Sequence, residues 1–62
     1  MIATWPAPPT TAAIRAARDA ANLTQAEAGA LLYCAARTWQ DWELGNRRMM
    51  PALFELFVIK TS

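Results

Sequence analysis

Polar side chains able to recognise nucleic-acid bases lie between residues 36 and 42, where Arg37, Gln40 and Asp41 share one side of a predicted helix. Trp39 and Trp42 are three residues apart, so they share a face that we expect to point inward. Arginine can bind two acceptors on guanine, glutamine can pair with adenine, and aspartate can accept a hydrogen bond from cytosine. This stretch therefore predicts a helix whose outer face could read base edges in a DNA major groove.

Simpler interpretations of the same charges stay open. Arg37 and Asp41 stand four residues apart and could pair with each other on a solvated face, which is compatible with base reading if the pair orients Arg37. Arg47 and Arg48 follow the helix and could contact phosphates or serve as ordinary loop charges. The net charge of the chain is only +1, so the placement of its charges matters more than their sum.

Several kinds of chemistry are poorly supported by the composition. Cys34 is the only cysteine and there is no histidine, so an ordinary zinc site is not expected and the commonest general base is missing. The carboxylates are scattered and form no acid–base pair. We therefore expect no enzyme activity, no metal, no cofactor and no small-molecule ligand.

The chain has 62 residues, enough for one small domain. Residues 1–10 contain three of the four prolines and no charged side chain, which predicts an extended N-terminal arm. Trp5 either folds back from this arm onto the domain or binds DNA or a partner. No apolar run approaches the roughly 18–20 residues of a membrane span, and residues 1–10 do not resemble a signal peptide. We expect a cytoplasmic protein without a membrane partner.

Residues 11–62 predict an all-α domain of four short helices. The first extends from Thr11 to about Ala21, with Arg15 and Asp19 as an exposed pair four residues apart and Asn22 at its exit. The second begins with a capping box, in which the Thr24 hydroxyl meets the backbone of Glu27 and the Glu27 side chain reaches back, and it stops near Tyr33. The third covers about 36–44 and ends at Gly45, and the fourth begins at Pro51 and reaches about Lys60.

These helices carry a set of motifs in a fixed order. Leucine-Thr-Gln-x-Glu opens the second helix at residues 23–27, and aromatic-Glu-x-Gly ends the third at Trp42, Glu43 and Gly45. In these features the run from Leu23 to Phe57 resembles the Cro/repressor (XRE-type) helix-turn-helix family, and phage or prophage regulators in particular. With Ile14 and Arg18 the resemblance covers about residues 12–60. It implies a lambda-repressor-like fold and a sequence-specific DNA-binding regulator.

The resemblance also assigns roles to individual residues. The third helix would enter the major groove and face base edges with Ala36, Arg37, Gln40 and Asp41. Phosphate contacts would come from Gln25, Thr38, Arg47 and Arg48. Arg18 and Glu43 would form a partly buried ion pair that ties the first helix to the third without reading DNA.

Two positions in the predicted turn depart from the family pattern. Tyr33 stands where glycine is usual, so either the turn is tighter and helical or Tyr33 accepts strain because its ring packs and its hydroxyl finds a partner. Ala35 replaces the usual polar cap, which costs the third helix about 1 kcal/mol of capping.

The fourth helix is apolar nearly all round, and we expect Phe54, Val58 and Ile59 to form the interface of a homodimer, with or without Trp5. A twofold dimer would place two recognition helices about 34 Å apart on a palindromic operator, and we expect it to act as a repressor by covering a promoter. The alternative is a protein-interaction module on the same scaffold, such as an antitoxin or an inhibitor of a larger partner.

Overall fold

A local signal in the sequence marks at least one end of each of the four helices. The structure, a computed structural model, describes residues 6–62, and the expectations for Trp5 lie outside that range. Helix α1 spans Thr11–Ala20 and is capped by the Thr10 hydroxyl, which accepts a hydrogen bond from the Ala13 amide at 3.0 Å. Asn22 follows with a positive φ of 59°, as expected at a helix exit. Residues 6–10, which precede α1, contain no helix.

Helix α2 spans Gln25–Leu31 and begins with the predicted capping box. The Thr24 hydroxyl accepts from the Glu27 amide at 3.1 Å, and the Glu27 carboxylate accepts from the Thr24 amide at 2.9 Å. The bond from the Thr24 amide is the main reason that the pKa of Glu27 lies below its usual value. The expected start of the second helix is therefore confirmed.

Helix α3 spans Ala36–Leu44, and helix α4 spans Pro51–Lys60 with its proline in the first turn. Gly45 ends α3 with a φ of 83°, a conformation that glycine adopts at little cost. Ala35 makes no side-chain cap to α3, as its lack of a polar group predicts. The described chain is all-helical, and among residues 6–62 no helix has the length and apolar character needed to cross a bilayer.

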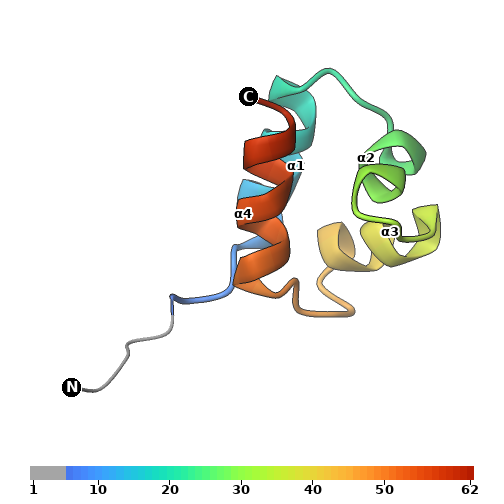
Figure 1. Ribbon diagram of the computed structural model, residues 1–62. Coiled ribbons are helices and arrows are strands. Elements are labelled where there is room, and N and C mark those ends of the chain that lie inside the picture. Colours follow the sequence, from blue (N-terminus) through green and yellow to red (C-terminus); the bar gives the residue numbers. More distant parts are fainter. Residues whose placement is uncertain (1–5) are drawn as a thin grey trace.

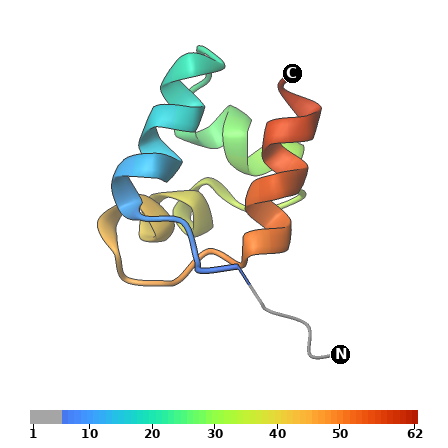
Figure 2. The same cartoon turned by 90° about the vertical axis from the view of Figure 1, so that its left-hand side faces the viewer.

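The helices form two layers, with α1 and α4 on one side and α2 and α3 on the other (Figure 1). Both α1 and α4 run toward the end of the molecule that holds the C-terminus (Figure 2). Helix α3 packs against α2 and α1, and α2 also contacts α4. The buried core between the layers contains residues from all four helices, from the loop after α2 and from the loop after α3. These residues are Ile14, Ala28, Leu32, Trp39, Trp42, Met49 and Phe57.

The turn between α2 and α3 resolves the question left open at Tyr33. Tyr33 adopts a positive φ of 58°, so it accepts the conformation in which glycine is usual. The expectation that its ring packs is wrong, because the residue is 89% exposed. The ring instead lies beneath the ammonium of Lys60, 4.5 Å from the Nζ atom to the ring centroid. The turn is therefore held from outside, by a contact with the last residue of α4.

Candidate nucleic-acid interface

The inner face of α3 is fixed by its two tryptophans. Trp39 is fully buried, with its ring centroid 4.7 Å from that of Phe57, and Trp42 is buried beside it at 5.6 Å in an edge-on arrangement. The expectation that both indoles point inward is confirmed. Because Arg37 and Gln40 stand on the opposite side of the helix, their side chains extend into solvent.

Gly29 allows α2 to approach the turn that leads into α3. A Cβ atom at Gly29 would lie 3.0 Å from the Cys34 carbonyl oxygen and 3.1 Å from that of Ala35. The Cys34 amide also donates to the Gly29 carbonyl at 2.8 Å. Backbone atoms move aside less easily than a flexible side chain, so this position favours glycine. Sequence reasoning missed it, although a glycine inside a predicted helix was the available signal.

A single carboxylate on the inner side of α3 accepts hydrogen bonds from donors on three helices. Glu43 is buried and accepts hydrogen bonds from Arg18 Nε and Nη2, from Trp39 Nε1, and from Gln25 Nε2 at 3.2 Å. The Arg15 guanidinium lies 3.5 Å from the same carboxylate. The predicted ion pair of Arg18 with Glu43 is confirmed.

The electrostatics of Glu43 follow from these donors. The hydrogen bond from Arg18 is the main reason that the pKa of Glu43 falls to about 2, against the opposing effect of burial. The same contact raises the pKa of Arg18 above its ordinary value. Glu43 therefore stays ionised across the physiological range and holds α1, α2 and α3 in one arrangement.

Arg15 does not form its expected pair with Asp19. Its guanidinium approaches Glu43 on α3, while Asp19 lies 3.7 Å from Arg18 Nη1. The buried carboxylate is the stronger attraction because it is screened less by water than an exposed aspartate on the same helix. A tertiary contact therefore replaces the local one.

A second carboxylate, Asp41, organises the outer side of α3. Its Oδ1 accepts from Arg37 Nε at 3.3 Å and from Asn46 Nδ2 at 3.4 Å, and its Oδ2 lies 3.9 Å from Arg47 Nε. The pairing of Arg37 with Asp41, which the sequence left open, is therefore present. The contact uses only the Nε of Arg37, which leaves both terminal amino groups of that guanidinium available.

The remaining predicted base-reading and phosphate-binding residues are distributed unevenly. Ala36 and Gln40 are exposed beside Arg37, whereas Thr38 is half-buried. Gln25 is also half-buried, and one of its two amide N–H groups is already used by Glu43. The structure thus brings Ala36, Arg37, Gln40 and Asp41 together on one helix and turns Gln25 partly inward.

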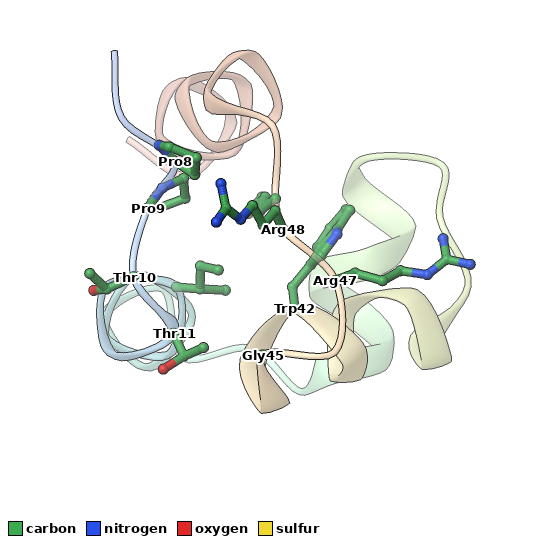
Figure 3. Close-up of a pocket in the computed structure, with 10 residues that line it drawn as sticks. Pro8, Pro9, Thr10, Thr11, Trp42, Gly45, Arg47 and Arg48 are labelled. Carbon is green, nitrogen blue, oxygen red and sulfur yellow. The ribbon is translucent and has the colours of Figure 1, made fainter.

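Arg47 and Arg48 are neighbours in sequence but point in different directions. Arg47 extends alongside α3 toward the side that carries Asp41, while Arg48 points toward Pro8 and Pro9 (Figure 3). Arg48 lies at a shallow cleft of about 360 Å³ between the arm, the start of α1 and the loop after α3. The cleft is lined by Pro8, Pro9, Thr10, Thr11, Ile14, Trp42, Gly45, Arg47, Arg48 and Met49.

The three residues expected to form a dimer interface differ in their burial. Phe54 is half-buried and packs against the core, while Val58 and Ile59 are exposed, Ile59 by 70%.

Within residues 6–62, no three histidine, cysteine or acidic side chains are grouped in a way that could hold a metal ion. Comparison of the chain with protein-family models gives no match, and no curated protein matches it.

Proposed function

We propose that this protein is a sequence-specific DNA-binding regulator, in which α2 and α3 form a helix-turn-helix and α3 enters the major groove. One observation carries the proposal: α3 buries both of its indoles and presents Arg37 and Gln40 to solvent. A major groove about 12 Å wide accepts one helix that is held by neighbours on its other side. The packing of α1 and α2 behind α3 supports that arrangement.

Base selectivity would come from the outer face of α3. Arg37 is held by Asp41 through Nε, so its two terminal amino groups can donate to O6 and N7 of guanine. Gln40 can make the corresponding pair with adenine, and the methyl group of Ala36 can pack against thymine. Asp41 would act both as an acceptor for cytosine and as the group that orients Arg37.

Affinity would come chiefly from phosphate contacts, for which Arg47 is the best-placed cation. Arg47 lies on the Asp41 side of α3, so it can approach the backbone that flanks a bound groove. Thr38 and the free amide N–H of Gln25 add neutral donors, while Arg48 points toward the N-terminal arm. With so few cations on this face, we expect a shallow dependence of affinity on salt.

The test begins with selection of binding sites from random duplexes, followed by affinity measurements on variants. Arg37→Ala should relax base preference at one position, whereas Arg47→Ala should weaken binding to all sequences alike. Arg48→Ala is the matched control, and we expect it to cost less affinity than Arg47→Ala. Uniform loss with Arg37→Ala would contradict its role as a base reader. Equal losses for Arg47→Ala and Arg48→Ala would make both residues phosphate contacts.

A protein-interaction module, such as an antitoxin or inhibitor, is the second candidate function. The low net charge and the exposed apolar side chains Leu44, Met50 and Ile59 favour it. The same selection separates the two candidates, because an interaction module would enrich no duplex sequence. A regulator acting as a homodimer would instead enrich two related half-sites about 34 Å apart.

A further inference from the structure

The outer surface of α4 carries an apolar stripe on residues that α4 does not need for the core. Ala52, Leu56 and Ile59 are exposed and recur at spacings of four and three residues, which places them on one side of the helix. Val58 is also exposed, but it lies about 100° around the helix from Ile59. The core contacts of α4 come from Leu53, Phe54 and Phe57 instead.

Opposite charges border this stripe. Glu55 directly precedes Leu56 and Lys60 directly follows Ile59, so one lies on each flank. Neither side chain forms an ion pair with any residue in the range 6–62. When two such helices pack in parallel, the flanking residue on one helix meets the residue five positions later on the other. Glu55 of one copy would then face Lys60 of the second.

The corner beside Lys60 adds an aromatic surface to the same end of α4. The Lys60 ammonium donates to the Leu31 carbonyl at 2.7 Å and lies over the ring of Tyr33. This leaves further N–H donors on the ammonium for a second acceptor. Tyr33 keeps its ring exposed although its backbone has the positive φ that favours glycine. Tyrosine is enriched at protein interfaces, where its ring gives contact area and its hydroxyl stays hydrated.

We propose that a second copy of this chain covers the stripe, with the two α4 helices parallel and Glu55 of each copy paired with Lys60 of the other. This proposal assigns a surface to the homodimer that the proposed regulator would form, and so it rests on the proposed function. It moves the interface away from Phe54 and Val58. Stable complexes bury roughly 800 Å² per partner, and we expect less here because few side chains take part. The dimer is therefore weak and depends on concentration.

Sedimentation equilibrium without DNA tests the proposal over a wide range of protein concentrations. The mass of the wild-type protein should rise from that of the monomer toward twice that value. Ile59→Glu should remain monomeric, and Val58→Glu, which places the same charge on the same helix outside the stripe, should still dimerise. Circular dichroism of both variants serves as the control for folding. Monomeric wild-type protein, or equal loss of dimer in the two variants, would overturn the proposal.

Charge reversal tests the parallel orientation. Glu55→Lys and Lys60→Glu should each raise the dimer dissociation constant by about tenfold, because each turns two ion pairs into repulsions. The double variant should recover the wild-type constant. In an antiparallel pair each flank would meet its own kind, so neither single variant would weaken the dimer, and that result would reject the parallel arrangement. Because these measurements contain no DNA, failure here is distinct from failure of the DNA selection.

Discussion

Two carboxylates on α3 are two residues apart and make different kinds of contact. Glu43 is buried and receives donors from α1, α2 and its own helix. Asp41 is half-buried, with its side chain 15% exposed, and contacts Arg37, Asn46 and Arg47, all from α3 or the loop after it. Residues two apart on a helix are separated by about 200° around its axis, so they face opposite environments. The inner carboxylate joins the helices, and the outer one arranges side chains that face solvent.

This difference shows how one short helix can be rigid on one side and adaptable on the other. The Glu43 contacts are shielded from water and hard to replace, while those of Asp41 compete with solvent and can be exchanged. A helix that reads a groove needs both properties. Its inner side must hold its position, and its outer cations must be able to change partners.

The largest expected effect comes from Glu43→Ala. It leaves the mostly buried guanidinium of Arg18 without its buried counter-ion, with only the exposed Asp19 nearby, and breaking such a buried pair costs about 3–5 kcal/mol. A domain this small has a total stability of the same order, so a large unfolded fraction is expected at room temperature. Urea titration followed by circular dichroism measures the loss. Asp41→Ala is the control and should cost less than about 1 kcal/mol; similar losses for the two would remove the contrast.

The pH dependence of stability should follow from Glu43. Its pKa is about 2 in the folded protein and 4.5 in the unfolded chain, so its contribution is complete above pH 4.5 and declines as the pH falls toward 2. The total is about 3 kcal/mol, since each pKa unit corresponds to about 1.4 kcal/mol. Urea midpoints between pH 2 and 6 test this, and Glu43→Gln should have a much flatter profile. An equally steep profile in that variant would assign the transition to other carboxylates.

Gly29→Ala tests the close contact between α2 and the turn before α3 through the sign of its effect on stability. In an open helix this change stabilises by about 0.5–1 kcal/mol, because alanine loses less conformational freedom on folding. At Gly29 the new methyl group would meet two carbonyl oxygens at about 3 Å, so we expect destabilisation by about 1–3 kcal/mol. Thermal unfolding measures the sign, and an increased melting temperature would show that the turn can move.

The smallest expected effect on stability is that of Arg37→Ala. The side chain is 79% exposed and its ion pair with Asp41 is a surface pair, so the change should be below about 0.5 kcal/mol. Any change in base preference of this variant can then be assigned to recognition. A loss of stability as large as that of Glu43→Ala would instead give Arg37 a role in the fold.

The local parts of this structure were predictable residue by residue. Thr24 with Glu27 predicted the start of α2, Pro51 that of α4, and Gly45 the end of α3, because capping depends on groups only a few residues apart. The inward direction of Trp39 and Trp42 followed from their spacing. In the candidate site, the common exposed face of Arg37 and Gln40 could be predicted from the sequence in the same way.

Other features depended on neighbours that are distant in sequence. Arg15 turns to Glu43 instead of Asp19, and Gln25 gives part of its amide to the same carboxylate. Phe54 is partly buried against the core, away from the interface that the sequence predicted for it. None of these outcomes can be obtained from helical spacing, since each depends on which other helix lies opposite.

The sequence alone therefore determined at least one end of each helix and the apolar side of α3, because hydrogen-bond caps and helical periodicity act over a few residues. The tertiary structure decided the partners of the charged groups, the divergence of Arg47 from Arg48, and the exposure of Tyr33 under Lys60. These choices depend on distances between helices, and only the packed core sets those distances.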